Sequence, residues 1–391
     1  LPILFLYSIR MKNSFKILGF GFGVFALLAA GKFDFNIEPY YSISDLKKLY
    51  SSGDPTTWPK ATLDSTLVNF REIGVLPEMT FPEDNPYSDE KKELGKQLFF
   101  DPRLSESGQI ACASCHDSQL GWSDGKRVSH GFGRTPGTRN SKTILNVGYG
   151  EVFMWDGRAL SLEDQVRFPM QDVKEMNTHP DVATKNIKKI KGYKEAFTKA
   201  FGDDEITTDR IAKAIATYER TIVSRKSRFD KFIEGDTTKL TNLEVEGLHL
   251  FRTKARCINC HNGPTFSDNQ FHNAGLTYFQ RKHEDLGRYH ITKDLADIGK
   301  FKTPTLRDLE STAPYMHNGF FPHIRGLLNL YNAGMPNLKP KPGQEDDPMF
   351  PVTSEHLKPL ELNEHELDAL EAFIKSLSTT VIRETEPKLP K

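Results

Sequence analysis

The chain has 391 residues, with 52 basic and 52 acidic side chains, so its formal net charge is zero. Proteins that bind nucleic acids or other polyanions carry an excess of basic residues, and this balance argues against that class. Hydrophobic residues make up 37% of the chain and charged residues 27%, which is typical of a globular protein rather than a bundle of membrane spans. The length suggests two or three domains, and four cysteines are too few for a disulfide scaffold.

The first predicted element is an export signal in residues 11–31. Two lysines, an apolar stretch and a run of small residues follow one another there, in the order found in secretory signal peptides. The alternative is that the apolar stretch is retained as an N-terminal membrane anchor. Residues 1–10 precede a methionine and are interpreted as a non-native upstream extension. Export predicts that the mature chain lies in a bacterial periplasm.

Residues 32–88 are predicted to form an N-terminal arm, mostly irregular and partly helical, because prolines and aromatic residues are scattered through it. A short helix is predicted over 89–100. Glycines and prolines then crowd residues 121–139, which indicates a long loop. Loops of that length are uncommon unless they have a function.

Three further helices are predicted in the second half of the chain. Apolar residues recur at helical spacing over 207–233, 243–251 and 364–377. Asn363 and Glu366 have the spacing of a capping pair for the last of these helices. Alternating strand patterns are scarce, so the chain is predicted to be mainly α.

All four cysteines lie in two copies of the pattern C-x-x-C-H. The copies are Cys112-Ala-Ser-Cys115-His116 and Cys257-Ile-Asn-Cys260-His261. In c-type cytochromes two thiols with this spacing bond to the vinyl groups of one haem, and the adjacent histidine binds the iron. The sequence therefore predicts two covalently bound haems, with His116 and His261 as iron ligands.

Other roles exist for paired cysteines. A zinc ribbon would unite four cysteines, but its pairs usually lie about 15–20 residues apart, and these pairs are far more distant. A thioredoxin-like dithiol would lie beside a βαβ pattern, and none is visible near either motif. Disulfides within each C-x-x-C would be strained. Only two haems use both histidines as well as all four cysteines.

Short motifs between and beyond the cysteines follow a fixed order. They are D-P-R-L-S at 101–105, W-D-G-R at 155–158, K-E-M-N at 174–177, K-T-P-T-L-R at 302–307 and T-A-P-Y-M-H at 312–317. Gln165 lies ten residues beyond Trp155, and Glu175 lies ten beyond Gln165. In these features, from about Leu94 to about Leu377, the sequence resembles the bacterial dihaem cytochrome c peroxidase family, which includes the relatives of MauG.

The resemblance implies two cytochrome c-like haem domains packed around a domain interface, with an N-terminal extension. In this chain the domains would span 89–235 and 236–380, followed by a tail at 381–391. The family also has a calcium ion between its domains.

The calcium ligands that the resemblance implies are Asn140 and the main-chain carbonyls of Thr312 and Pro314. A hard cation is suited to neutral oxygen donors and waters of this kind.

A division of labour is also implied by the resemblance. The haem bound by His116 would react with H2O2, and the haem bound by His261 would receive electrons from a small cytochrome c or cupredoxin. Trp155 matches a tryptophan placed between the haems, where it can relay an electron or simply fill the domain boundary.

Reduction of H2O2 requires a group that takes a proton from the oxygen next to iron and returns it to the other oxygen. Glu175 matches that group, and Gln165 matches a residue that can hydrogen-bond the bound peroxide. Without the resemblance, Glu175 would be interpreted as an ordinary surface charge.

The remaining iron ligands are also inferred from the resemblance. His130 matches a histidine that caps the peroxide-reacting iron in resting relatives, although it could instead be an exposed loop residue. The second ligand of the other haem is a methionine in electron-accepting relatives, and here that position is Tyr331, as in the MauG-like branch. Met335 is the alternative, but Gly334 and Pro336 are expected to end the helix before it.

Three functions are compatible with these residues. The first is a cytochrome-c peroxidase, an oxidoreductase that uses H2O2 and a small electron-donor protein. The second is a MauG-like enzyme that oxidises a protein substrate through high-valent haem. The third is a dihaem electron carrier, which would not need Gln165 and Glu175. No nucleic-acid partner is expected, and a homodimer is left open.

Overall fold

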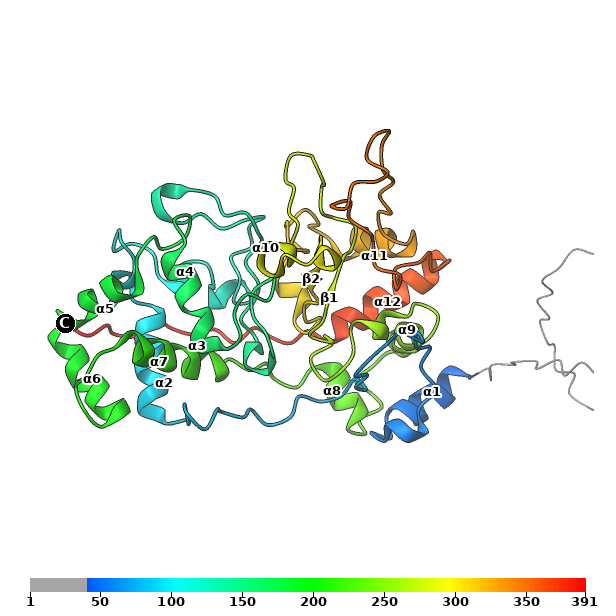
Figure 1. Cartoon of the computed structure of the whole chain (residues 1–391). Helices are drawn as coiled ribbons and strands as arrows, with labels where there is room; N and C mark the ends of the chain where they lie inside the picture. Colours follow the sequence, from blue (N-terminus) through cyan, green and yellow to red (C-terminus); the bar gives the residue numbers. More distant parts are fainter. Residues whose placement is uncertain (1–40) are drawn as a thin grey trace, which may run out of the picture. The chain divides into compact units, whose positions relative to one another are not determined.

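Helices are the main regular secondary structure of residues 41–391, the part of the chain that the computed structural model describes (Figure 1). The α-helices in this range are Ile43–Tyr50 (α1), Asp89–Phe99 (α2), Leu162–Gln165 (α3), Arg167–Gln171 (α4), Pro180–Lys188 (α5), Lys191–Phe201 (α6), Thr208–Arg220 (α7), Arg228–Ile233 (α8), Asn242–Arg252 (α9), Tyr289–Thr292 (α10), Ile324–Asn332 (α11) and Glu364–Ser376 (α12). The sheet structure within the described range is one antiparallel pair, β1 (Phe271–His272) and β2 (Phe301–Lys302). The prediction of a mainly α chain is therefore confirmed for these residues.

Most of the predicted helices form close to their expected bounds. The segments predicted at 89–100, 243–251 and 364–377 become α2, α9 and α12. At the start of α12, the Asn363 side chain accepts a hydrogen bond from the Glu366 backbone N–H, and the Glu366 side chain bonds back, as expected for a capping box.

The segment at 207–233 differs from its prediction, because it is two helices, α7 and α8, rather than one. Ser227 caps the start of α8 through a reciprocal pair of hydrogen bonds with Asp230. Before it, the backbone N–H of Ser224 donates to the Asn146 side chain over 2.9 Å, which holds the chain in an extended turn. Side-chain hydrogen bonds of this kind compete with a continuous helix.

Buried hydrophobic side chains fall mainly into two clusters. The first, which includes Trp122 and Tyr218, is built on α2, α5, α6 and α7. The second, which includes Phe251 and Phe373, is built on α8, α9, α11 and α12, and it also takes Tyr50 from the N-terminal arm. We call them the first and second clusters.

Both clusters contain the same close helix crossing. α2 meets α7 at Gly95, where a Cβ atom would lie 1.9 Å from the carbonyl oxygen of Ala214. α9 meets α12 at Gly247, where a Cβ atom would lie 1.9 Å from the carbonyl oxygen of Ala369. Only glycine allows backbones to approach this closely. In each cluster the glycine-bearing helix precedes a C-x-x-C-H motif.

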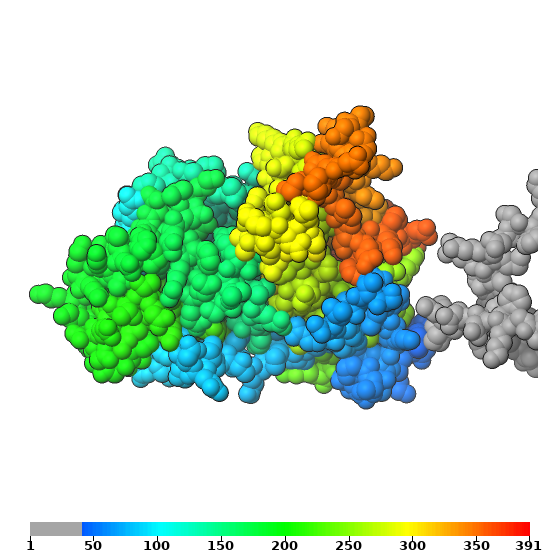
Figure 2. Space-filling model, viewed as in Figure 1, coloured from blue at the N-terminus to red at the C-terminus, as the bar shows by residue number. Residues whose placement is uncertain are grey.

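The ends of the described chain pack onto opposite clusters. In the N-terminal arm, the Tyr50 hydroxyl lies 3.0 Å from Nδ1 of His249 on α9. The first described part of the arm is the dark blue segment beside the second cluster in the space-filling view (Figure 2). After α12 the chain runs back to the first cluster, where Trp122 Nε1 donates to the carbonyl of Ile382 over 3.1 Å (Figure 1). Neither cluster is therefore made from one continuous segment.

The predicted export signal at 11–31 lies outside the described residues. Across residues 41–391, each helix is too short or too polar to span a bilayer. The predicted domain boundaries stay a prediction, since contacts join residues 41–391 into a single unit.

Candidate functional site

Each C-x-x-C-H motif forms one 3-10 turn that brings its histidine under the first cysteine. The backbone N–H of His116 donates to the carbonyl of Cys112 over 3.0 Å, and that of His261 donates to Cys257 over 2.9 Å. All four cysteines are free thiols. Disulfides within the motifs therefore receive no support from the described residues, and the thiols are available for another bond.

The histidines of the two motifs are held in the same tautomer. Nδ1 of His116 lies 3.2 Å from the carbonyl oxygen of Trp122, and Nδ1 of His261 lies 3.0 Å from that of Phe266. Because a carbonyl can only accept, Nδ1 carries the hydrogen and Nε2 keeps its lone pair. Burial lowers the pKa of both imidazoles, which favours the neutral form. Each histidine thus presents an Nε2 suited to iron.

Two cavities adjoin these motifs. The larger, of about 720 Å³, is lined by both cysteines and the histidine of the first motif and extends to His261 and Tyr331. The smaller, of about 160 Å³, is lined by the cysteines and histidine of the second motif. Trp155 lines both cavities.

Trp155 is fixed on several sides and is 8% exposed. Its Nε1 donates to the carbonyl of Asn140 over 2.9 Å, and its own carbonyl accepts from the backbone N–H of Lys302 over 2.8 Å. The Lys142 ammonium lies 4.0 Å from the centre of the indole ring, and His317 meets that ring edge-on at 6.3 Å between centroids. The indole therefore has one defined orientation between the cavities.

Glu175 and Gln165 both line the larger cavity, as their common role in the sequence analysis requires. Burial, with a contribution from the charge of Asp172, raises the pKa of Glu175 to about 6, while Arg158 acts in the opposite direction. Gln165 ends α3, and its Nε2 lies 3.8 Å from the sulfur of Met154. The cavity thus holds a carboxyl group that changes charge near neutral pH beside a neutral amide.

His130 is not brought into the larger cavity, although its neighbours Ser129 and Gly131 line it. The His130 side chain is exposed. Gly131 is pressed against the segment that carries Glu175, since a Cβ atom there would lie 2.2 Å from the carbonyl oxygen of Lys174. For His130 to bind iron, this loop would have to rearrange.

Tyr331 lines both cavities, whereas Met335 lines neither. α11 ends at Asn332, before Met335, as the sequence predicts. Burial, together with the charges of Cys260 and Cys257, raises the pKa of the Tyr331 hydroxyl. Of the two residues weighed as an iron ligand, the structure brings only Tyr331 to the second motif.

The three residues predicted to bind calcium all line the larger cavity. The side-chain nitrogen of Asn140 donates to the carbonyl of Lys126 over 3.0 Å, which leaves its Oδ1 as an acceptor. Thr312 and Pro314 border the same space from another part of the chain. The donors are therefore neutral oxygens, with which calcium bonds in many proteins.

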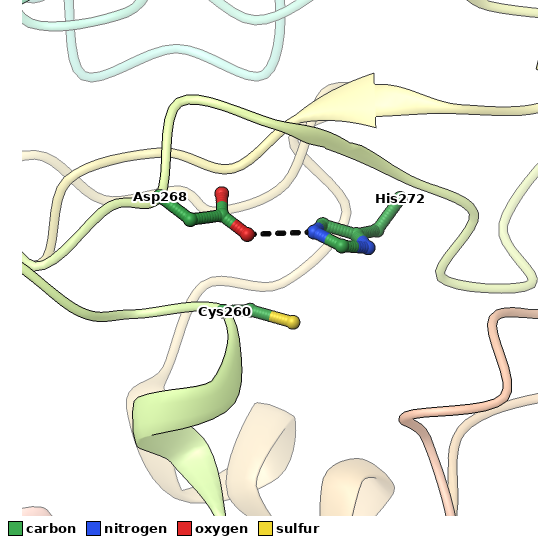
Figure 3. Close-up of side chains that lie close together, drawn as sticks. All are labelled: Cys260, Asp268 and His272. Atoms are coloured by element: carbon green, nitrogen blue, oxygen red, sulfur yellow. Dashed lines mark hydrogen bonds and ion pairs between the residues drawn. The ribbon is translucent and has the colours of Figure 1, made fainter. Parts of the chain in front are cut away.

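Another group of potential metal ligands is formed by Cys260, Asp268 and His272 (Figure 3). Nε2 of His272 lies 2.8 Å from Oδ2 of Asp268. Because Cys260 belongs to the second haem-binding motif, the group does not constitute an independent metal site. The Asp268–His272 pair instead borders that motif, and His272 lines the smaller cavity.

Three residues of the larger cavity were missed in the sequence. Lys142, Lys302 and Glu219 all line it. Burial lowers the pKa of both lysines, for Lys302 to about 8, and raises that of Glu219. Lys142 and Glu219 belong to no motif quoted above, and Lys302 had no assigned role, so the sequence contained no signal for their burial.

Fold and site together define a helical protein with two C-x-x-C-H motifs, each beside a cavity that Trp155 also lines. Residues 89–238 match the family model described as di-haem cytochrome c peroxidase. The chain is 37% identical over 348 residues to cytochrome-c peroxidase IdrP1 of Pseudomonas sp. (strain SCT), covering 81% of this chain and 89% of that protein. It is 39% identical over 312 residues to methylamine utilization protein MauG of Methylorubrum extorquens, covering 79% and 84%.

A solved structure gives the same result. The crystal structure of a MauG-like protein associated with microbial copper homeostasis matches with a TM-score of 0.70 and 29% identity, covering 81% of this chain and 96% of that one. The chain belongs to the dihaem cytochrome c peroxidase family, and its function is of the dihaem peroxidase type.

Proposed function

We propose that the mature chain is a periplasmic c-type dihaem peroxidase, which reduces H2O2 to water with electrons from a small cytochrome c or cupredoxin. One observation carries this proposal: Glu175 and Gln165 line the same cavity as the haem-binding residues of the first motif. A cavity that only transferred electrons would need neither a carboxyl group to move protons nor an amide to hold peroxide.

The residues around each motif fit a covalently bound haem. Two free thiols and a histidine whose Nδ1 lies near a carbonyl oxygen adjoin each cavity. The matching helix crossings at Gly95 and Gly247 support two cytochrome c-like domains at 89–235 and 236–380. Neutral oxygens of Asn140, Thr312 and Pro314 fit a calcium ion between them.

When bound, the haem of the first motif would supply an iron that accepts peroxide and exchanges electrons with it. Side chains of the protein would transfer the proton, orient the peroxide and relay the electrons. Glu175, ionised above a pKa of about 6, takes a proton from one peroxide oxygen and returns it to the other. Gln165 orients the peroxide by a hydrogen bond. Trp155 bridges the cavities and passes electrons from the second motif to the first.

A second function is favoured by Tyr331. A tyrosine ligand stabilises ferric and more oxidised iron, whereas a methionine ligand stabilises ferrous iron. Tyr331 lines the smaller cavity, beside the second motif, and Met335 does not. This supports the MauG-like alternative, in which the oxidising power of peroxide is applied to a protein substrate. A simple electron carrier is the least supported function, because it leaves Glu175 unused.

The test combines haem quantitation with rapid kinetics on the exported protein. Haem staining after denaturing electrophoresis and a pyridine haemochrome assay should give two covalent haems per chain. Stopped-flow mixing of peroxide with ferrous cytochrome c or cuprous cupredoxin should then show catalytic oxidation of the donor. One haem or none would overturn the proposal, and peroxide consumption without oxidation of either donor would favour the MauG-like function.

A further inference from the structure

Glu219 is a buried carboxyl group without a partner in the cavity proposed to bind peroxide. It lies near the end of α7, is 5% exposed and lines the larger cavity. Its Oε2 has no hydrogen-bond partner among the described residues. The adjacent Arg220 directs both of its terminal nitrogens to Glu163 of α3, over 2.6 and 3.0 Å.

Burial has the largest effect on the pKa of Glu219, and the nearby charged groups have smaller effects. Arg220 lowers the pKa of Glu219 and Glu163 raises it, and these two opposite charges are bonded to each other. From α2 and the C-terminal segment, the acidic Glu93 and Glu384 act on the neighbouring Tyr218 instead. Burial then raises the pKa of Glu219 to about 8, so the group holds a proton at neutral pH.

The carboxyl groups of Glu219 and Glu175 line the same cavity but differ in pKa. Both line the larger cavity, and both carboxyl groups act on the thiol of Cys112. Their pKa values of about 8 and about 6 mean that near pH 7 Glu219 is protonated while Glu175 is ionised. Carboxyl groups separated in this way take different parts in acid–base chemistry.

Peroxide reduction can use both the protonated carboxyl group of Glu219 and the ionised carboxylate of Glu175. The balanced reaction is HOOH + 2 e⁻ + 2 H⁺ → 2 H2O, so two protons must enter the cavity for each peroxide. Glu175 only moves a proton from one oxygen to the other and ends the cycle as it began. It therefore supplies neither of the two protons that the reaction consumes.

We propose that Glu219 is the proton reserve of this cavity, releasing one of the two protons consumed per peroxide and regaining it from solvent between turnovers. The inference rests on the proposed peroxidase function. During the reaction the O–H bond of the Glu219 carboxyl breaks, its proton joins the oxygen that leaves as water, and the electrons come from the donor protein. Glu219 is a positioning residue, because it determines where the proton is stored and need not touch the peroxide.

The first test is the pH profile of peroxide turnover in Glu219→Gln, which keeps the shape of the side chain but has no proton to release. The wild type should lose activity as the pH rises through about 8, falling about ten-fold to the level of Glu219→Gln. Glu219→Gln should be about ten-fold slower at pH 7 and lack that alkaline limb. Glu219→Asp should keep the limb. Glu83→Gln, which makes the same change at an exposed position, should match the wild type.

The second test measures proton uptake when the fully reduced enzyme, carrying two electrons, reacts with one equivalent of peroxide in lightly buffered solution containing a pH indicator. The wild type should take up one proton with the reaction and a second in a later phase. Glu219→Gln should take up both in the reaction phase. Identical phases in the two proteins would overturn the inference alone, whereas a wild type that does not reduce peroxide would overturn the proposed function with it.

Discussion

The two haem-binding motifs of this chain have nearly the same immediate surroundings but different cavities. In both, the histidine Nδ1 lies near a carbonyl oxygen, that of Trp122 or of Phe266, and a glycine crossing precedes the motif. The first motif borders the larger cavity, of about 720 Å³, which Glu175 lines. The second motif borders the smaller cavity, of about 160 Å³, which Tyr331 lines and Glu175 does not. The difference teaches that the motif alone does not distinguish the two sites, and that residues remote in sequence make their surroundings different.

Removing the cysteines of one motif at a time should produce the largest effect. Cys112→Ala with Cys115→Ala should leave one covalent haem per chain and abolish peroxide turnover, because peroxide would have no iron beside Glu175. Cys257→Ala with Cys260→Ala should also leave one haem, but should abolish turnover only when electrons come from a donor protein. Pyridine haemochrome assays and turnover with chemical and protein reductants distinguish the two. Equal behaviour of both variants would contradict the division of labour.

Replacing the acid–base group of the first cavity should have the next largest effect. Glu175→Gln should keep both haems and lower peroxide turnover by about 10²–10⁴-fold, because an amide cannot take and return the proton. Since the pKa of Glu175 is raised to about 6 and the ionised form is required, wild-type turnover should rise with pH through about 6, and the variant should lack this limb. Glu83→Gln is the matched control. A Glu175→Gln enzyme within two-fold of wild type would remove Glu175 from the mechanism.

The proposed role of Tyr331 as an iron ligand is tested by replacing it with methionine, the ligand of electron-accepting haems. Tyr331→Met should raise the reduction potential of one haem, on the order of 0.1 V, and leave the other unchanged. Spectroelectrochemical titration measures both potentials. Met335→Ala is the control and should alter neither. A methionine–iron charge-transfer band in the ferric wild type that disappears in Met335→Ala would identify Met335 as the ligand instead.

The smallest expected effect concerns the two similar helix crossings, one in each hydrophobic cluster. Gly95→Ala and Gly247→Ala should each lower the free energy of unfolding by about 1–3 kcal/mol, because the new methyl group meets a backbone oxygen that cannot move aside. Gly326→Ala on α11 has open space around it and should be neutral or slightly stabilising. Denaturant unfolding of the haem-loaded proteins measures the free energy of unfolding of the three variants. No loss of stability at either crossing would mean that the helices can separate at little cost.

Local signals in the sequence were sufficient for several elements. The capping box of Asn363 and Glu366 and the end of α11 before Met335 involve residues a few positions apart, so they can be recognised without the fold. The single helix expected over 207–233 was wrong because the break depends on Asn146, which lies far away in the sequence and bonds to Ser224. A helical period does not reveal such a distant partner.

By itself the sequence determined the two C-x-x-C-H motifs, the mainly α character and the spacing of Trp155, Gln165 and Glu175, because these depend on residue type and on distance along the chain. Only the tertiary structure decided that Tyr331 and Glu219 reach the cavities, that His130 lies outside, and that a carbonyl oxygen lies beside Nδ1 of His116 and of His261. Burial, pKa and tautomer are properties of surroundings. Those surroundings are assembled from segments far apart in the chain, so no pattern within one segment contains them.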